Sequence, residues 1–343
     1  MANPTEGVMP RVLSDQVVVV TGASSGIGRE TAIELGERGA SVVLAARNEA
    51  ALNEVAMAVE RLGGAAEVVV TDVAEWPSVD RLAQAAVERF GRIDTWVNNA
   101  AVSAYARVEE MTIEEIERVI QVILMGQVYG MKAVLPHLIE QGQGTIVNVA
   151  SALAERAVPL QAPYCAAKHG IKGFTEALRL ELARDHPGIT VTLVMPSSIN
   201  TPLFRHARSK LGAMPKPIPP IYEPRAVAEA ILFAAEHPRR DIVVGGGGKL
   251  MVMGERVSPA LVDWYMLRNG RMFKQQRTNR PDNGQDNLFA PMPGSDATTG
   301  AFGQMSKSTS LYTRHLELHP NRKRVLNAAA ALGAIALVRR IGR

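Results

Sequence analysis

The sequence is poor in several residue types, and each shortage excludes a class of protein. A single cysteine, Cys165, among 343 residues excludes an internal disulfide framework and fits a reducing compartment. Charged residues make up only 21% of the chain against 47% apolar residues, which excludes a disordered chain and allows a packed core. Residues 1–16 lack the apolar stretch of a secretory signal, so we expect a cytoplasmic protein.

A large net charge is also absent from the main part of the chain, and the two parts differ in sign. Residues 1–254 hold 24 Lys and Arg against 28 Asp and Glu, a net charge of −4. Residues 255–343 hold 14 against 6, a net charge of +8. A mildly acidic main domain does not attract phosphate backbones, so we expect no nucleic-acid partner.

Short β-branched runs alternate with helical patterns along most of the chain. The predicted strands lie at residues 16–21, 41–46, 66–70, 93–97, 145–149, 189–194 and 241–244. Strands joined by helices form a parallel sheet with helices on both faces. The sequence therefore predicts a doubly wound α/β domain over residues 13–250, followed by an extension over residues 251–343.

The first strand runs directly into a glycine-rich turn that opens a helix. Such a turn lets backbone amides approach a pyrophosphate, and the helix N-terminus adds partial positive charge. A plain tight turn is the alternative. The spacing is G-xxx-G-x-G rather than G-x-G-xx-G, and the candidate cofactor-binding residues are Gly22, Ser24, Ser25, Gly26, Ile27 and Gly28.

Arg47 follows the second strand, where a dinucleotide fold meets the adenosine ribose. An acidic residue there accepts from a 2′-hydroxyl, whereas an arginine pairs with a 2′-phosphate. Ala46 offers no carboxylate, so the sequence favours NADP(H), with NAD(H) as the alternative cofactor. Arg47 could equally be a solvated surface residue.

Polar residues also follow the third and fourth strands. Asp72 lies where contacts to the adenine amino group form, or it caps a helix. Asn98 and Asn99 either hold a turn together or satisfy backbone groups between neighbouring strands. Either role places both asparagines beside the cofactor cleft, at the carboxyl edge of the sheet.

Ser151, Tyr164 and Lys168 form the candidate catalytic group. A spacing of four places Tyr164 and Lys168 on one face of a helix. The positive charge of Lys168 would lower the pKa of the phenol from its usual ~10. The Ser151 hydroxyl would orient a substrate oxygen. The alternative is an ordinary amphipathic helix with a surface tyrosine and lysine.

The segments from residue 203 onward indicate less about function. Residues 203–224 are Pro-rich and basic, which is typical of a lid or binding loop or of a mobile excursion. The glycine cluster 245–248 is interpreted as an edge turn. Residues 257–273 could form a helix, and the polar stretch 278–310 is predicted to be partly disordered.

An apolar helix is predicted over residues 325–338, with basic residues on both sides. Its 14 residues are fewer than the ~20 that span a membrane. The basic flanks suit an anionic membrane surface. Peripheral membrane contact or a short anchor, packing within an oligomer, and a loose tail remain the three interpretations.

The motifs together resemble the short-chain dehydrogenase/reductase family in its compact single-domain branch. They are TGASSGIG at 21–28, NNAA at 98–101, VNVAS ending at Ser151, YCAAK at 164–168 and PSSINT at 196–201. The resemblance spans residues 13–250. It implies a seven-stranded Rossmann-type sheet and hydride transfer between a nicotinamide and a carbonyl or alcohol. We expect that substrate to be small and mostly apolar. The resemblance also implies dimers or tetramers formed through the two long helices.

The same resemblance implies a role for individual residues. Tyr164 would be the proton donor and acceptor, Lys168 would bind the nicotinamide ribose, and Ser151 would steady the reacting oxygen. The implied cofactor contacts are Asp72 and Val73 to adenine, Asn99 and Ala100 to the riboses, and Ile199 and Thr201 to the nicotinamide carboxamide.

Three positions depart from the family pattern. Ile123 stands where the family has a fourth catalytic residue, an asparagine that holds a proton-relay water. Ala101 replaces the commoner glycine of NNAG, and Ser197 replaces the glycine that usually follows Pro196. Because of Ile123, a cofactor-binding regulator or scaffold with little turnover is one alternative function. A membrane-associated protein recruited by its tail is another.

Overall fold

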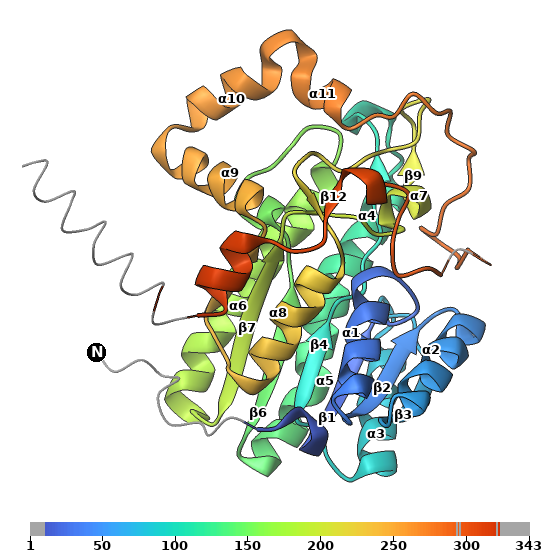
Figure 1. Ribbon diagram of the computed structural model, residues 1–343, viewed down its shortest axis with the longest axis vertical. Coiled ribbons are helices and arrows are strands. Elements are labelled where there is room, and N and C mark those ends of the chain that lie inside the picture. The colour runs from blue at the N-terminus through green and yellow to red at the C-terminus, as the bar shows by residue number, and fades with distance from the viewer. Residues whose placement is uncertain (1–10, 293, 295, 320–321, 323–343) are drawn as a thin grey trace, which may run out of the picture.

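The computed structural model describes residues 11–292, 294, 296–319 and 322 (Figure 1). The predicted apolar helix 325–338 lies outside the described residues.

A seven-stranded sheet with every pair of neighbours parallel forms the centre of the molecule. Its strands, in spatial order, are β11 (Asp241–Val244), β7 (Ile189–Pro196), β6 (Gly144–Val149), β4 (Thr95–Asn98), β1 (Val17–Thr21), β2 (Ser41–Ala46) and β3 (Ala65–Val70). The order reverses between β1 and β4, which is where doubly wound sheets bind ligands. The predicted fold class is therefore confirmed.

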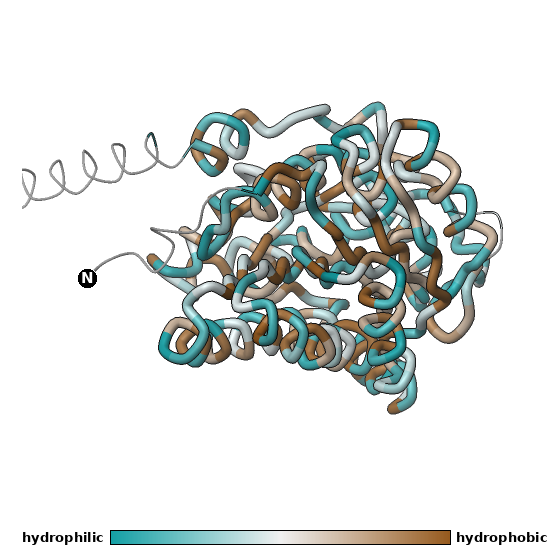
Figure 2. Tube along the Cα trace, turned by 90° about the horizontal axis from the view of Figure 1, so that it is seen from below, coloured by the Kyte–Doolittle hydropathy of each residue, from teal (hydrophilic) through white to brown (hydrophobic). Residues whose placement is uncertain are grey.

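Helices cover both faces of the sheet, because successive strand residues point to opposite sides. Val18 and Val20 belong to a core cluster with α1 (Gly26–Glu37), α2 (Glu49–Arg61) and α8 (Arg225–Glu236). Val17 and Val19 belong to the opposite cluster, whose helices are α3 (Trp76–Phe90), α4 (Ile113–Ile120), α5 (Gly126–Gln141) and α6 (Ala162–Asp185). Figure 2 shows helices whose residues alternate between hydrophilic and hydrophobic, as amphipathic packing requires.

The predicted long helix over residues 112–141 consists of three joined parts. Thr112 caps α4 through a reciprocal pair of bonds with Glu115. A π-helical turn, Gln121–Met125, joins α4 to α5. The whole stretch Ile113–Gln141 is long and apolar enough to cross a membrane by composition, but half of its most apolar window is buried in the protein. Within the described part of the chain it therefore packs as a core helix.

Two expectations for the region after β11 are wrong. The glycine cluster 245–248 does not form an edge turn, because α9 (Gly246–Val257) begins inside it. The predicted helix over 257–273 is divided into α10 (Pro259–Leu267), a 3₁₀ turn and α11 (Arg271–Gln275). Ser258 caps α10 by accepting from the backbone N–H of Leu261. Pro259 lacks an N–H, so it cannot continue α9 and instead occupies the first turn of α10.

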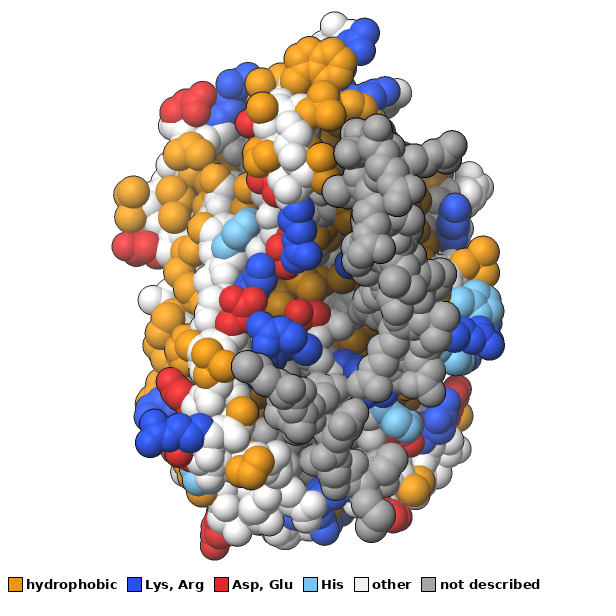
Figure 3. All heavy atoms as spheres, turned by 90° about the vertical axis from the view of Figure 1, so that its left-hand side faces the viewer, with side chains coloured by type: hydrophobic (Ala, Val, Ile, Leu, Met, Phe, Trp, Pro, Cys, Tyr) orange, Lys and Arg blue, Asp and Glu red, His pale blue; other side chains and the backbone are white. Residues whose placement is uncertain are grey.

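Helices α9 to α11 form an arm that projects from the catalytic domain (Figure 1). Figure 3 shows hydrophobic side chains beside Lys and Arg at the top of the face it views. The exposed apolar residues of the arm are Leu250, Met253, Val257, Leu261, Trp264, Tyr265 and Leu267.

Parts of the stretch 278–310, predicted to be partly disordered, pack against the domain. Leu288 and Phe302 are buried, and β12 (Ser306–Lys307) pairs with β10 (Ile221–Tyr222). β10 pairs in turn with β8 (Ser198–Ile199). A few apolar anchors and backbone bonds thus attach parts of an otherwise polar segment, and its partial disorder remains a prediction.

Candidate active site

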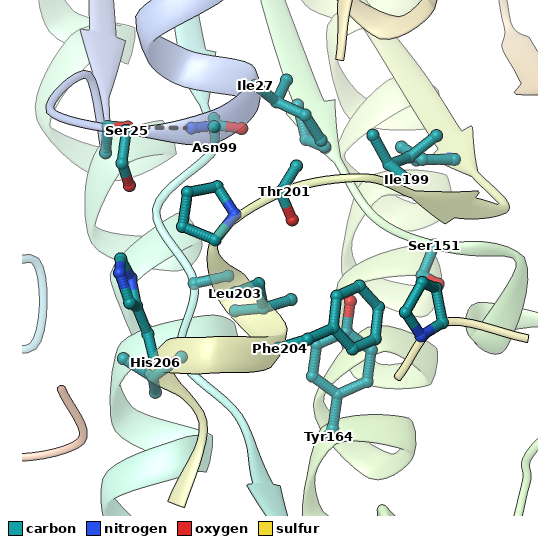
Figure 4. Close-up of a pocket in the computed structure, with 18 of the residues that line it drawn as sticks. Ser25, Ile27, Asn99, Ser151, Tyr164, Ile199, Thr201, Leu203, Phe204 and His206 are labelled. Carbon is teal, nitrogen blue, oxygen red and sulfur yellow. Dashed lines mark hydrogen bonds between the residues drawn. The ribbon is translucent and has the colours of Figure 1, made fainter. Parts of the chain in front are cut away.

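A cavity of about 320 Å³ opens at the carboxyl ends of the central strands. That volume is in the range of small-molecule and cofactor sites. The structure brings almost every predicted site residue to its wall: Gly22, Ser24, Ser25, Gly26, Ile27, Arg47, Asp72, Val73, Asn99, Ala100, Ser151, Tyr164, Lys168, Ile199 and Thr201. Figure 4 shows how residues from the glycine turn, from the end of β4 and from the segment after β7 converge on this space.

Gly28 is the exception, since it does not line the cavity. A Cβ at this position would lie 2.2 Å from the carbonyl oxygen of Gly22, so only glycine lets the turn close. Gly22 and Gly26 have positive φ angles of 68° and 56°. Ser25 precedes α1 without a side-chain cap bond, which leaves the first amides of the helix to other acceptors.

Asn99 holds the glycine turn to the sheet. Its Nδ2 donates to the carbonyl of Thr21 at 2.9 Å, and its backbone N–H donates to Thr21 Oγ1 at 2.9 Å. Asn98 behaves differently, because its side chain points away from the cavity and donates to Asn148 Oδ1 at 2.9 Å in the buried core. The expectation that both asparagines lie beside the cleft is wrong for Asn98.

Arg47 is not a solvated surface residue. Its Nη2 donates to the carbonyl of Asn287 at 2.5 Å, and burial lowers the pKa of its guanidinium. The other terminal nitrogen, Nη1, is buried without a hydrogen-bond partner in the described structure. A buried charged donor without an acceptor is costly, so Nη1 is suited to an anionic ligand.

The Asp72 carboxylate is held by two donors. Arg118 Nη2 lies 2.6 Å from Asp72 Oδ2, and the backbone N–H of Ala74 donates to Oδ1 at 3.0 Å. Asp72 does not cap α3, because the N-cap residue of that helix is Glu75. By accepting from Ala74, the Asp72 carboxylate stabilises a local turn at the cavity wall.

Tyr164 and Lys168 project from one face of α6, and Ser151 lies at the end of β6. The ammonium Nζ of Lys168 donates to the carbonyl of Val149 at 2.8 Å and lies 5.5 Å from the centre of the Tyr164 ring. Lys168 is only 2% exposed, which excludes a solvated surface pair. Ser151 lines the same cavity as the phenol of Tyr164, and both side chains are labelled in Figure 4.

Burial dominates the electrostatics of this group. It lowers the pKa of Lys168 to about 7. Burial also raises the pKa of the Tyr164 phenol well above 10, and the hydrogen bond from Ser151 lowers it only in part. The expectation that Lys168 holds the phenol pKa below its usual value is therefore wrong here, because a lysine with a pKa near 7 carries only part of its charge at neutral pH.

Ile123 is fully buried in the π-helical turn and packs in the core. One turn further along the helix, Gln127 is 2% exposed and donates from Nε2 to the carbonyl of Val149 at 2.9 Å. That carbonyl is the one that accepts from Lys168. Gln127 Oε1 is buried with no partner among the described residues. Sequence reasoning missed Gln127, although its spacing of four from Ile123 was visible.

The remaining wall of the cavity is mostly apolar. The Pro-rich stretch 203–224 contributes Leu203, Phe204, His206 and residues 216–220, as expected of a lid or binding loop. The arm contributes Met251 and Met272. Sequence reasoning also missed four wall residues from the extension, which are Asn287, Pro291, Met292 and Asp296.

No group of three or more His, Cys, Asp or Glu in the described residues could hold a metal ion. Among the groups that line the described site are a phenol, an amine and a hydroxyl, together with a glycine turn.

Comparison with known proteins agrees with this arrangement. The family model of the short chain dehydrogenases matches residues 16–212. The uncharacterized oxidoreductase YxnA of Bacillus subtilis (strain 168) is 38% identical over 326 residues, covering 94% of this chain and 90% of that protein. The human dehydrogenase/reductase SDR family member 7 is 38% identical over 199 residues, 57% of this chain and 58% of that protein.

A solved structure is also similar to this chain. The alcohol dehydrogenase of the archaeon Thermococcus sibiricus, complexed with 5-hydroxy-NADP, superposes with a TM-score of 0.59 at 25% sequence identity. The match covers 67% of this chain and 95% of that one. The fold, the convergent site and these similarities together show that the chain is an oxidoreductase of the short-chain dehydrogenase/reductase family.

Proposed function

We propose that the protein interconverts an alcohol and a ketone or aldehyde by hydride transfer, with NADP(H) as the preferred cofactor. The observation that carries the proposal is the convergence of Ser151, Tyr164 and Lys168 on a cavity whose far end is formed by the glycine turn. A nicotinamide, when bound there, supplies or accepts the hydride.

The residues around the cavity fit a phosphorylated dinucleotide. The unpaired Nη1 of Arg47 favours a ribose 2′-phosphate over a hydroxyl. Asp72 and Val73 would contact adenine, and Asn99 and Ala100 the riboses. Ile199 and Thr201 would contact the carboxamide. The bound 5-hydroxy-NADP of the archaeal alcohol dehydrogenase supports the same preference.

In the direction of reduction, Tyr164 donates its phenolic proton to the carbonyl oxygen while Ser151 donates a hydrogen bond to the same atom. A phenol whose pKa is raised by burial stays protonated and ready to donate. Tyr105, Phe204 and the two methionines Met251 and Met272 line the cavity and favour a mostly apolar substrate.

Oxidation and reduction should respond to pH in opposite ways. Oxidation needs the phenolate of Tyr164, whose pKa lies above 10, so its rate should rise between pH 7 and 9, by up to tenfold per unit. Reduction should decline above pH 7, because Lys168 then loses the proton that resupplies the phenol. Both kcat values, measured with one alcohol and ketone pair across this range, test the assignment. A pH-independent oxidation rate would contradict it.

Gln127 offers a proton route in place of the asparagine missing at Ile123. Gln127 Nε2 and Lys168 Nζ both donate to the carbonyl of Val149, and Oε1 of Gln127 has no partner among the described residues. A water that accepts from Lys168 and donates to this Oε1 would complete the route. Gln127 is then a positioning residue for the proton supply.

Replacing Gln127 with Leu should lower the kcat of reduction about tenfold with little change in KM, and should alter its dependence on pH above 7. The substitution Ile123→Asn should leave activity equal or higher, because it introduces the asparagine that holds the proton-relay water in the family pattern. Steady-state kinetics of both variants check this pair. A large loss in Ile123→Asn, or a Gln127→Leu enzyme with a normal pH profile, would refute the relay.

A screen of carbonyls and alcohols that follows NADPH absorbance tests the function as a whole. Turnover of an apolar member supports the proposal. Tight NADPH binding without turnover on any of them would instead support the alternative of a regulator or scaffold. A cytoplasmic location, a homo-dimer or homo-tetramer and peripheral membrane contact through the tail remain predictions.

A further inference from the structure

The described residues of the segment 286–302, which are 286–292, 294 and 296–302, are called the strap below, and they lie along the dinucleotide end of the cavity. The strap begins with three attachments to the catalytic domain. Arg208 Nε donates to Asp286 Oδ2 at 2.9 Å, and the backbone N–H of Asn287 donates to the carbonyl of His206 at 2.9 Å. The Leu288 side chain is fully buried in the core cluster shared with α3, α5 and α6.

Two arginines of the domain then bind successive carbonyls of the strap. Arg47 Nη2 donates to Asn287 O at 2.5 Å, and Arg118 Nε donates to Leu288 O at 3.0 Å. Arg118 also binds Asp72 at 2.6 Å. The strap is therefore attached at the position where β2 and β3 end, which is the adenosine side of the cleft.

The far part of the strap lies against the glycine turn. Arg29 Nη1 donates to Asp296 O at 2.8 Å, Asn48 Nδ2 donates to Asp296 Oδ2 at 2.7 Å, and the backbone N–H of Gly26 donates to Ala297 O at 3.0 Å. The described strap is thus fixed on both sides of the adenosine end, and four of its residues line the cavity.

Two polar atoms in this corner have no partner within the described residues. They are Nη1 of Arg47, a charged donor, and Oδ1 of Asn287, an acceptor, and both are buried. Both residues line the cavity. A ribose that carries a 2′-phosphate presents matching groups, since its phosphate oxygens accept and its 3′-hydroxyl donates.

We propose that the strap is a wall of the cofactor site and that Asn287, together with Arg47, binds the phosphorylated adenosine ribose. The inference rests on the proposed NADP(H)-dependent function and adds a specificity residue from outside the segment 16–212 that the family model matches. The carbonyl of Asn287 orients the guanidinium through Nη2, and its side chain completes the ribose site beside the free Nη1.

The substitution Asn287→Asp tests this role with almost no change in shape. The new carboxylate would pair with Arg47 Nη1 and repel a 2′-phosphate, whereas an unphosphorylated ribose would still find an acceptor. We expect the ratio of the Kd for NADPH to the Kd for NADH to rise about 30-fold. Fluorescence or calorimetric titration of the whole chain without substrate measures both constants. Asn283→Asp, an exposed position with the same charge change, is the matched control and should leave the ratio unchanged.

A second variant tests the strap itself. Leu288→Ala removes the buried anchor, so the NADPH dissociation rate in stopped-flow displacement should rise about tenfold, while Leu311→Ala, at an exposed position, should not change it. Wild-type affinity for NADPH together with an unchanged ratio in Asn287→Asp would overturn the inference and leave the proposed function standing. A wild-type chain that binds neither dinucleotide would overturn both.

Discussion

Replacing Tyr164 with Phe should lower kcat for carbonyl reduction by about a thousandfold, while the Kd for NADPH stays within a factor of two. The ring still packs in its place, but the proton donor is gone, and positioned general acids contribute about 10²- to 10⁴-fold. Tyr164 and Ser151 both line the cavity, which places the phenol where it can reach the reacting oxygen. Initial rates of NADPH consumption with a substrate from the screen, together with fluorescence titration of NADPH, measure both quantities.

Tyr265→Phe is the control for this change, because Tyr265 lies on the exposed arm and should be silent in both measurements. Thermal unfolding of the two variants separates chemistry from folding. Wild-type kcat in the Tyr164→Phe enzyme would mean that another group donates the proton, and the proposed mechanism would then fail.

The sheet and most of the site could be predicted because their signals are local. A β-branched run followed by a glycine turn defines β1 and the start of α1 within a dozen residues, and the spacing of Tyr164 and Lys168 follows from helix geometry alone. The ends of parallel strands meet at one edge of a sheet, so Arg47, Asp72 and Asn99 could be grouped without coordinates.

The strap could not be predicted, because its order comes from contacts distant in sequence. Arg47 and Asn287 are 240 positions apart, and Arg118 and Leu288 are 170 apart. A polar composition resembles that of a disordered linker, and a single buried residue such as Leu288 is invisible in it. The same reason explains Asn98, whose direction is decided by Asn148 and not by its neighbours.

The electrostatic prediction for Lys168 and Tyr164 failed for a related reason. Their spacing in a helix was correct, but the degree of burial depends on the whole fold. Removing both groups from water raises the phenol pKa and lowers the amine pKa at the same time. Sequence spacing contains no information about that desolvation.

Arg47→Asp should reverse the cofactor preference, with the affinity for NADPH falling about 100-fold and that for NADH unchanged or higher. The change removes the free Nη1 donor and places a carboxylate beside the 2′-phosphate. Titration with both dinucleotides measures the ratio, and Arg61→Asp on the exposed side of α2 controls for the change in net charge. An unchanged preference would mean that the ribose binds elsewhere.

The double variant Arg47→Asp, Asn287→Asp connects this prediction to the strap. If both residues bind the same phosphorylated ribose, the effect of Asn287→Asp depends on Arg47, whose Nη1 the new carboxylate would pair with. The double variant should then change the NADPH to NADH ratio by less than the product of the single effects. Independent contributions would multiply instead. Because Arg47 and Asn287 are 240 positions apart, such coupling would show that the extension contributes to cofactor binding.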